Sequence, residues 1–455
     1  MMKSRARYVL TNTLLICLGV GMMTSVRAQD AQNQEDESVK GSLVIIGGSE
    51  RFSQREIWDE IVELAGGAGA KIAVFPTASG DPIRKGGWVV SALNKSGAEA
   101  FLVPLAWMKV QDQPSEIAQD PAWVSQVRES SGVFFVGGSQ DRIVRALYDL
   151  EGKETPMLEA VWDLYRRGGV IAGTSAGAAV MSRVMYRDAP SVLDTMIGGV
   201  RMGKEIDRGL GFLKETWFVD QHCLVRGRFA RALVAMHDQG FQYGFGVDEN
   251  TAVVVKHGLY GKVIGYKGVL IMDLAHAEHD QKLGKFNLSN VRLTYLDKGD
   301  IFKLDTLEFT PLAERMDDEV LDPKSPDFRP ASRRQLFFND ILGNTTVADL
   351  MAKLMENHHE EAIGLAFDGE QARKESVDGF EFRFSRDADS IAWFTEMFGS
   401  DDYTILNIRL DIRPIRIKGP LYEVHAVEEE QTASASDVTS GEATSVKVPV
   451  SSGNE

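Results

Sequence analysis

Residues 168–180 read GGVIAGTSAGAAV, and this stretch decides the fold. The apolar run Val170 to Ala172 is typical of a buried strand, and the alanines that follow Ser175 favour a helix. Gly173 and Gly177 flank the serine in the pattern Gly-x-Ser-x-Gly, which lets a chain turn sharply from strand to helix. A glycine-lined turn that merely ends a core strand is the plainer interpretation. The strand and helix on either side favour a nucleophile elbow, with Ser175 as the candidate nucleophile.

A serine nucleophile needs a base, and His222 is the best candidate among eight histidines. It ends the run Val219-Asp220-Gln221-His222, where a strand is expected to present the ring at a sheet edge. His237 and His257 lack such a polar cluster, and His276 and His279 lie in a predicted solvated loop. A histidine bonded only to a local carbonyl remains the alternative for His222.

Two adjacent carboxylates, Asp248 and Glu249, follow in the sequence Gly-Val-Asp-Glu-Asn-Thr. One of them is expected to orient the imidazole and to stabilise its protonated form. In an extended segment neighbouring side chains point to opposite faces, so only one can reach the histidine. Asp188 and Asp194, shortly after the serine, are weaker rivals.

These segments resemble a known family. Gly-Thr-Ser-Ala-Gly-Ala at 173–178, Asp-Gln-His at 220–222 with Arg-Gly-Arg at 226–228, and Val-Asp-Glu-Asn-Thr-Ala at 247–252 look like the cyanophycinase branch of the serine peptidases. Phe-Phe-Val-Gly-Gly-Ser-Gln at 134–140 resembles the family's Gly-Gly-Asp-Gln loop, with Ser139 where aspartate is usual. Ordered motifs over residues 42–260 are far less expected by chance than one elbow.

The resemblance implies a class I glutamine amidotransferase-like fold, no metal and no organic cofactor. Its triad falls on Ser175, His222 and Glu249. It also implies as substrate cyanophycin, a polyaspartate with arginine on each side-chain carboxyl, or β-aspartyl-arginine peptides derived from it. Ser139 keeps hydrogen bonding but loses a charge there. Matched substrate-binding positions are Gln140, Asp220, Gln221, Arg226, Arg228 and Arg231.

The chemistry of these residues suits such a substrate. Arg226, Arg228 and Arg231 fall within six residues, and guanidinium groups hold carboxylates in two-point contacts. A helix that begins near Gly227 would place Arg228 and Arg231 on one face. Gln140, Asp220 and Gln221 offer acceptors for a substrate guanidinium. For the oxyanion we expect the backbone amides of Gly138 and Ala176.

Short apolar strands alternate with amphipathic helices before residue 175, which predicts an α/β fold with a mostly parallel sheet covered by helices on both faces. The loops after these strands converge on one edge, together with the elbow. The predicted strands are 43–46, 71–75, 100–103, 132–136 and 169–172, and the predicted helices are 54–65, 122–129 and 142–150. Later strands are expected at 252–255, 262–266 and 290–295.

Composition predicts several parts along the 455 residues. A catalytic domain at 42–320 ends before three prolines in eight residues, at 323, 326 and 330. A smaller α+β extension of unknown role follows at 333–426, with a helix at 347–357 and a strand at 406–412, after which Pro414 marks an edge or bulge. Residues 427–455 are rich in Ser, Thr, Ala and Glu, and predict a disordered acidic tail.

The N-terminus predicts export. Residues 1–28 combine a basic start, an apolar run and the small-x-small pattern Val26-Arg27-Ala28, which is typical of a signal peptide. A retained membrane anchor is the alternative, although the run is short for a span. Residues 29–41 would then be a linker. We expect a periplasmic or extracellular protein without a stable membrane span.

Removal of residues 1–28 takes away four positive charges and changes the formal charge from −16 to −20. Such acidity disfavours nucleic acid as a partner and suits a cationic polymer. Cys223 is then the only cysteine left, and we expect a packed core thiol. The sequence leaves a homodimer open.

The sequence therefore predicts an exported serine peptidase of the cyanophycinase type. Two alternatives stay open: a peptidase of the aspartyl dipeptidase type, and a non-catalytic exported protein that binds arginine-rich peptides.

Overall fold

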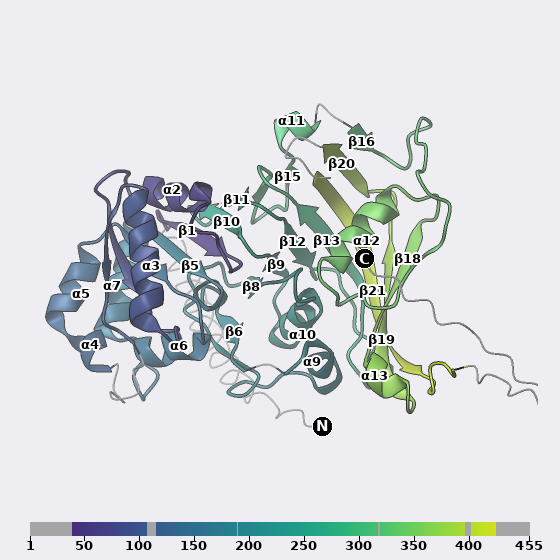
Figure 1. Ribbon diagram of the computed structural model, residues 1–455, viewed down its shortest axis with the longest axis horizontal. Coiled ribbons are helices and arrows are strands. Elements are labelled where there is room, and N and C mark those ends of the chain that lie inside the picture. The colour runs from purple at the N-terminus through teal and green to yellow at the C-terminus, as the bar shows by residue number, and fades with distance from the viewer. Residues whose placement is uncertain (1–38, 107–114, 189, 317–318, 396–401, 425–455) are drawn as a thin grey trace, which may run out of the picture.

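The computed structural model describes residues 39–106, 115–188, 190–316, 319–395 and 402–424. The predicted signal peptide at 1–28, most of the linker at 29–41 and the predicted tail at 427–455 lie outside these ranges. Within them, none of the helices has the length and apolar character needed to cross a membrane. Two large sheets stand next to each other, and Figure 1 shows the first on the left and the second on the right.

The first sheet contains the predicted parallel core. Its strands run in the order β15-β14-β11-β10-β1-β5-β4-β2-β3. The last five strands of this order, β1-β5-β4-β2-β3, pair in parallel. The five parallel strands agree with the prediction within two residues at each end, so the α/β class is confirmed. They are β1 (Ser42–Ile46), β5 (Val170–Thr174), β4 (Gly132–Phe135), β2 (Lys71–Phe75) and β3 (Glu99–Leu102).

Helices cover both faces of this parallel core, as predicted. Alternate strand residues point to opposite faces, so that Val44 packs with one helix layer and Ile45 with the other. The helix predicted at 142–150 ends earlier, because Tyr148 turns extended and pairs with Glu154. One layer is α2 (Arg55–Leu64) and α3 (Pro82–Lys95); the other includes α4 (Ser115–Gln119), α5 (Pro121–Arg128), α6 (Gln140–Leu147) and α7 (Pro156–Arg166).

The rest of the first sheet is antiparallel, so the sheet as a whole is mixed rather than mostly parallel. After β1 the order continues through antiparallel strands. β10 and β11 form a hairpin, since the turn at His257 and Gly258 is too short for a crossover helix, and β14 and β15 form another. These strands are β10 (Thr251–Lys256), β11 (Tyr260–Gly265), β14 (Ile301–Lys303) and β15 (Phe309–Thr310).

The second sheet has the path β17-β18-β19-β21-β13-β12-β9-β8, with β20 on β21 and β16 on β20. Its pairings are antiparallel except β8 with β9 and β17 with β18. The strands are β8 (Trp217–Gln221), β9 (Tyr243–Val247), β12 (Val269–Asp273), β13 (Leu288–Leu296), β16 (Glu319–Leu321), β17 (Leu336–Phe338), β18 (Glu361–Phe367), β19 (Val377–Ser385), β20 (Ile391–Thr395) and β21 (Asp402–Ile417).

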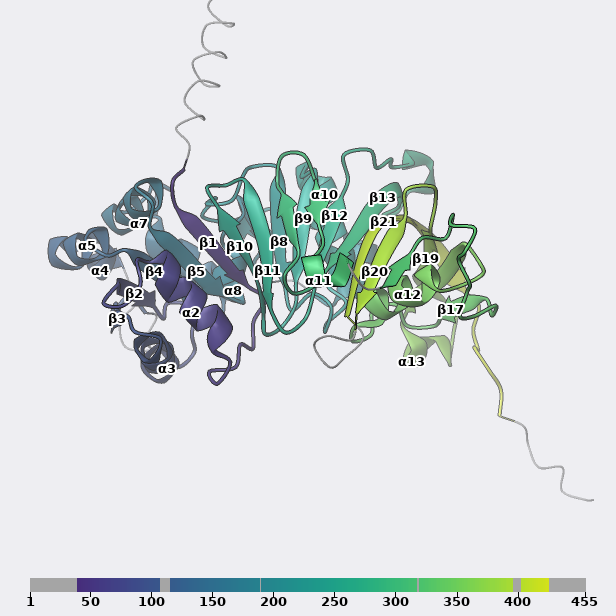
Figure 2. The same cartoon turned by 90° about the horizontal axis from the view of Figure 1, so that it is seen from above.

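The predicted boundary near residue 323 does not separate two folding units. β21 pairs with β13 as well as with β19, so the segment 333–426 extends the sheet begun by residues 217–296 (Figure 2). α10 (Phe229–Gln239) and α12 (Thr346–Met355) share one hydrophobic core with these strands. At Pro414 β21 pairs with β19 but no longer with β13, which gives the predicted edge position.

Smaller elements complete the described part of the chain. A two-stranded antiparallel sheet of β6 and β7, with helix α9 between these strands in the sequence, lies between the elbow and β8 along the chain. The smaller elements are α8 (Ala176–Ala179), β6 (Val184–Tyr186), α9 (Val192–Gly198), β7 (Ile206–Arg208), a 3-10 turn (Gln281–Leu283), α11 (Ala313–Met316) and α13 (Gly369–Ala372).

Candidate active site

Ser175 lies on the predicted elbow between β5 and α8. Its φ of 53° and ψ of −109° are strained values for a residue with a side chain. The two flanking glycines are required by contact: a Cβ at Gly177 would lie 2.2 Å from the carbonyl oxygen of Phe135, and one at Gly173 would lie 2.4 Å from that of Gly177. The Ser175 amide donates to Ile46 on β1, which ties the turn to the neighbouring strand.

His222 comes from the second sheet, directly after β8, and its Nε2 lies 2.9 Å from Ser175 Oγ. The loop after β1 holds it there, because the His222 amide donates to the carbonyl of Gly47. Gly48 has a φ of 120°, and a Cβ at this position would lie 2.3 Å from the imidazole ring. The first sheet therefore supplies both the serine and the backbone against which the histidine packs.

Glu249 follows β9, the strand beside β8, and accepts a hydrogen bond of 2.6 Å from His222 Nδ1. Asp248 faces the other way and is fully buried. It accepts from the Val225 amide and pairs with Lys267 at 3.0 Å. The structure thus brings Ser175, His222 and Glu249 into one chain of hydrogen bonds and leaves Asp248 outside it.

The electrostatics of this chain favour a neutral imidazole. Burial, and then the positive charges of Arg226 and Arg228, lower the pKa of His222 below its usual range, although Glu249 opposes them. Burial opposes ionisation of Glu249, but hydrogen bonds from His222 and Ser49 keep the pKa of its carboxyl below the ordinary value. A neutral histidine beside an ionised carboxylate is able to accept a proton from the serine hydroxyl.

The predicted oxyanion amides flank the nucleophile. Gly138 follows β4 with a φ of 151°, and a Cβ there would lie 2.0 Å from the carbonyl oxygen of Ala78. At Gly137 a Cβ would lie only 3.2 Å from that of Ser175, so the glycine backbone runs against the serine. Within the described part of the chain, the amides of Gly138 and Ala176 donate to no other group.

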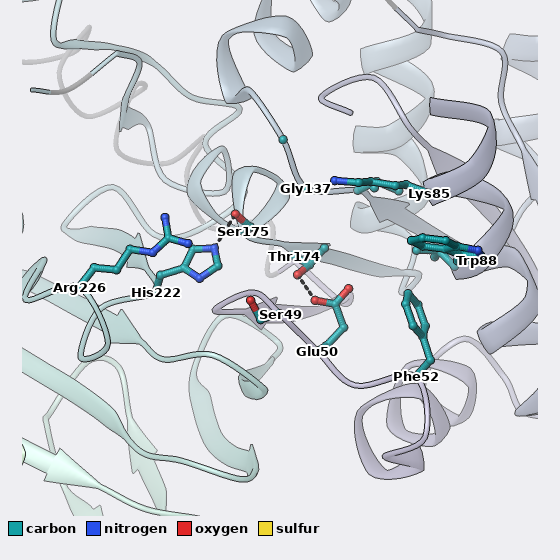
Figure 3. Close-up of a pocket in the computed structure, with 13 residues that line it drawn as sticks. Ser49, Glu50, Phe52, Lys85, Trp88, Gly137, Thr174, Ser175, His222 and Arg226 are labelled. Atoms are coloured by element: carbon teal, nitrogen blue, oxygen red, sulfur yellow. Dashed lines mark hydrogen bonds between the residues drawn. The ribbon is translucent and has the colours of Figure 1, made fainter. Parts of the chain in front are cut away.

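Two cavities open on either side of Ser175, and Ser175, His222, Gly138 and Arg226 border both. The basic cavity measures about 310 Å³, and the acidic-aromatic cavity about 410 Å³ (Figure 3). The basic cavity is also lined by Ser139, Gln140, Tyr186, Arg187, Asp188, Gln221, Arg228 and Arg231. The acidic-aromatic cavity is also lined by Ser49, Glu50, Phe52, Lys85, Trp88, Val89, Val136, Gly137 and Thr174.

The three predicted arginines do not act as one clamp. Arg226 is about half exposed and borders both cavities. Arg228 precedes α10 and donates to the carbonyl and the side-chain oxygen of Gln221. Burial lowers the pKa of Arg228 to about 10, so its guanidinium still carries a charge at neutral pH.

Asp220 and Arg231 pair with each other. Both are buried, and Arg231 donates two hydrogen bonds of 2.7 Å to the Asp220 carboxylate. Each group therefore neutralises the other, which favours a structural role over the predicted binding of substrate ions, although Arg231 still borders the basic cavity. A sequence pattern cannot reveal this pairing, because the two residues meet only where α10 packs on β8.

Gln140 and Gln221 border the basic cavity as expected, but both are already engaged. The Gln140 side-chain nitrogen donates to the carbonyl of Tyr186, and Gln221 Oε1 accepts from Arg228. Ser139 donates 2.6 Å to Asp141, so a carboxylate lies beside the position where the family usually has aspartate. That carboxylate is in turn paired with Arg145.

Sequence reasoning missed most of the acidic-aromatic cavity. Glu50, Phe52, Lys85 and Trp88 border it, together with Thr174. The only signal was that Gly47 and Gly48 follow a strand, which brings the next residues to the carboxyl edge of the sheet. Sequence reasoning also missed Tyr186 and Arg187, which border the basic cavity. They lie at the end of β6 and directly after it.

Two further predictions concern other groups. Cys223 is a buried free thiol packed in the core of the second sheet, as expected, and burial raises its pKa. Asp194 accepts from Ser191 at the start of its own helix, away from the imidazole. Among the described residues no group of three or more His, Cys, Asp or Glu side chains is arranged to hold a metal ion.

Comparison with known proteins identifies the family of this chain. The chain matches Peptidase family S51 over residues 43–260. It is 32% identical over 275 residues to a cyanophycinase of Geminocystis herdmanii, which covers 59% of this chain and 95% of that protein. A cyanophycinase of Trichormus variabilis is 30% identical over 301 residues, covering 65% of this chain and 96% of that protein.

A solved peptidase from an acI-B1 Actinobacterium is 22% identical, with a TM-score of 0.41, over 52% of this chain and 91% of that one. The fold, the elbow and the sequence relatives define a serine-type peptidase, a hydrolase. The chain belongs to peptidase family S51 and is a cyanophycinase-like peptidase.

Proposed function

We propose that this chain is an exported peptidase that hydrolyses cyanophycin to β-aspartyl-arginine dipeptides through an acyl-enzyme on Ser175. The relatives named cyanophycinase support the substrate. The observation that carries the mechanism is the relay of 2.9 Å from Ser175 to His222 and 2.6 Å from His222 to Glu249, open to a cavity on each side.

In the first step Ser175 Oγ attacks the backbone carbonyl carbon of an aspartyl residue. Its proton passes to His222 Nε2, and Glu249 stabilises the imidazolium that forms. In this proposal the amides of Gly138 and Ala176 donate to the oxyanion, which is supported by their donating to no other group within the described part of the chain. The C–N bond then breaks, and His222 gives the proton to the leaving amine.

In the second step water resolves the acyl-enzyme. His222 takes a proton from the water as its oxygen attacks the ester carbonyl, and it returns that proton to Ser175 Oγ. The lowered pKa of His222 supports this role, because the neutral ring that both steps require is present at neutral pH.

The charges around the basic cavity suit carboxylates of the substrate. Arg226, Arg228, Arg187 and Arg231 border it, and Asp188 is the acidic residue in its lining. Arg231 is paired with Asp220 and Arg187 with Asp207, so Arg226 and Arg228 are the arginines that support carboxylate binding best. A β-aspartyl-arginine unit carries such carboxylates, on the chain end and on the arginine.

Export is the second part of the proposal. It rests on residues 1–28, whose basic start, apolar run and small-x-small site form a signal pattern. Expression of the full chain in a Gram-negative host, followed by fractionation and N-terminal sequencing, tests it. A mature N-terminus at Gln29 in the periplasm is expected; a full-length chain in the cytoplasm contradicts export and leaves the enzymatic proposal standing.

The enzymatic proposal is tested with the chain from Gln29 onward and its Ser175→Ala variant. Each is incubated with insoluble cyanophycin, and soluble β-aspartyl-arginine is measured by mass spectrometry. We expect dipeptide from the parent only, with Ser175→Ala slower by about 10⁴-fold or more, since loss of a serine nucleophile has effects of this size.

Other outcomes redirect the assignment. Cleavage of Asp-X dipeptides without cleavage of cyanophycin indicates an enzyme of the aspartyl dipeptidase type. Tight binding of cyanophycin without any cleavage indicates a binding protein. Equal activity of the parent and Ser175→Ala removes Ser175 from the mechanism.

A further inference from the structure

The acidic-aromatic cavity has residues that the proposed mechanism does not use. Besides the elbow, His222 and Arg226, which also border the basic cavity, its lining includes Glu50, Phe52, Lys85 and Trp88. Figure 3 shows these four side chains around an open space next to Ser175 and Thr174. Their charge pattern differs from that of the basic cavity on the other side of the nucleophile.

Glu50 is a carboxyl group beside the nucleophile that lacks a cationic partner. It accepts a hydrogen bond from the Thr174 hydroxyl, one residue before Ser175. Burial raises the pKa of its carboxyl, although Thr174 and the more distant charge of Lys85 oppose this. Within the described part of the chain Glu50 forms no ion pair. A cation brought by a ligand would supply the missing counter-charge.

Two exposed aromatic side chains continue the cavity from Glu50. Phe52 is 45% exposed and Trp88 is 47% exposed, and their rings meet edge to face at 6.1 Å. Phe52 also stacks at 5.6 Å on Trp58, a buried residue, which fixes the ring. Rings held in this way at the mouth of a cavity offer apolar faces to a planar group.

The guanidinium of one protein residue, Arg84, already lies over the Trp88 ring. Arg84, one turn earlier on α3, lies over it at 5.2 Å, and Arg84 itself does not line the cavity. Beyond the two rings a smaller hollow of about 260 Å³ is bordered by Phe52, Trp88 and Lys95. The aromatic surface therefore extends away from Ser175.

We propose that the acidic-aromatic cavity is a subsite for the arginyl group of the substrate residue on one side of the scissile bond, with its guanidinium on Glu50 and against Phe52 and Trp88. Carboxylate and aromatic faces together are the surroundings that a guanidinium prefers. Lys85, which pairs with no acidic residue in the described ranges, lies on the same rim and receives the α-carboxylate of that arginine. This inference rests on the proposed function.

Other occupants fit the cavity less well. An aliphatic side chain would bury Glu50 further without a partner, which is costly for a carboxylate. An anionic side chain would meet Glu50 directly. The β-aspartyl-arginine unit carries a guanidinium and a carboxylate together, and Glu50 and Lys85 provide the opposite charge for each.

The test compares arginine with citrulline, which has the same shape but no charge. Synthetic trimers of β-aspartyl-arginine are made with citrulline at one position at a time, and kcat/KM is measured for each. For the parent we expect arginine to be preferred about 10- to 100-fold at one residue flanking the scissile bond, as for a charged hydrogen bond. Glu50→Gln should bring that preference close to 1 and leave the other positions unchanged.

Matched variants separate recognition from structure. Glu50→Asp keeps the charge and should retain part of the preference, whereas Trp88→Ala should reduce it with an increase in KM. Glu63→Gln on α2 and Ile83→Ala on α3 are exposed, line neither cavity, and should behave as the parent.

Each outcome decides one of the two proposals. If Glu50→Gln slows all trimers equally and the arginine preference persists, Glu50 only supports Thr174 and the subsite is overturned, while the proposed function stands. If the parent cleaves no trimer, the proposed function fails, and binding of the trimers to Ser175→Ala is measured by calorimetry. Glu50-dependent preference for arginine over citrulline in binding then supports the subsite; equal binding or no binding overturns it.

Discussion

The two halves of the active site are built in different ways. Ser175 is fixed by its immediate neighbours, because Gly173, Gly177 and the ends of β4 and β5 leave one path for the chain. His222 and Glu249 stand at the ends of β8 and β9 in the other sheet, and they meet Ser175 only because the two sheets abut. A local turn thus makes the nucleophile, whereas long-range packing makes the base.

The loop after β1 connects the two halves of the active site. Gly47 accepts from the His222 amide, and Gly48 accepts from the Asn250 amide, so one loop holds the base and the residue that follows Glu249. A change in the packing between the two sheets can therefore displace His222 and Glu249 and lower activity without changing the elbow at Ser175. Changes on the second-sheet side should therefore lower activity while the first sheet stays folded.

The largest effect after removal of the nucleophile is expected from Glu249→Gln. An amide keeps the shape but cannot stabilise the imidazolium, and we expect kcat to fall about 10³- to 10⁴-fold. Asp248→Asn should lower kcat much less, since Asp248 faces Lys267 and not the histidine. Steady-state kinetics of both variants check this order; the reverse order would assign the orienting role to Asp248.

Gly48→Ala tests the contact between the loop after β1 and the ring of His222. Its Cβ would lie 2.3 Å from the imidazole ring, so the ring must move and we expect activity to fall about 10- to 100-fold. Gly67→Ala is the matched control, because Gly67 also has a positive φ, of 84°, but open space around it. Both variants should lose similar thermal stability. Equal activities of the two would show that the collision with His222 does not matter.

Arg231→Met tests the buried ion pair between Arg231 and Asp220. Removal of one partner of the buried pair leaves Asp220 charged and unpaired, and we expect about 3 to 5 kcal/mol less stability. The double variant Asp220→Asn with Arg231→Met should recover a large part of this loss. Denaturant unfolding measures both; a single variant as stable as the parent would argue against a structural ion pair.

The smallest effect is expected from Arg226→Gln. The Arg226 charge helps to lower the pKa of His222, so its removal raises that pKa. Because only the neutral ring accepts the serine proton, activity on the acid side should then be lost at a higher pH than in the parent. The pH profile of kcat/KM measures this, with Lys214→Gln, an exposed residue that lines neither cavity, as the control. An unmoved or lower acid limb contradicts the assignment.

Local sequence was a good guide to the first sheet. The parallel strands, the elbow and three of the covering helices, α2, α5 and α6, were predicted within a few residues, because short-range hydrophobic pattern and glycine positions determine them. The strands predicted at 252–255, 262–266, 290–295 and 406–412 also match β10, β11, β13 and β21, but their antiparallel pairing and the continuous second sheet were not predicted. The prolines between 323 and 330 suggested a separate extension, yet β21 completes the sheet through β13, more than a hundred residues earlier in the chain.

The sequence by itself determined the candidate nucleophile, the candidate base and the order of the motifs, since each is carried by residues adjacent in the chain. The family resemblance implied Glu249 as the partner of the histidine, and the tertiary structure brings these two together and turns Asp248 away. Only the tertiary structure decided that Asp220 binds Arg231 and that Glu50 lies open beside the elbow. Strand register and sheet packing set which face each side chain occupies, and a shift of one residue would reverse these choices.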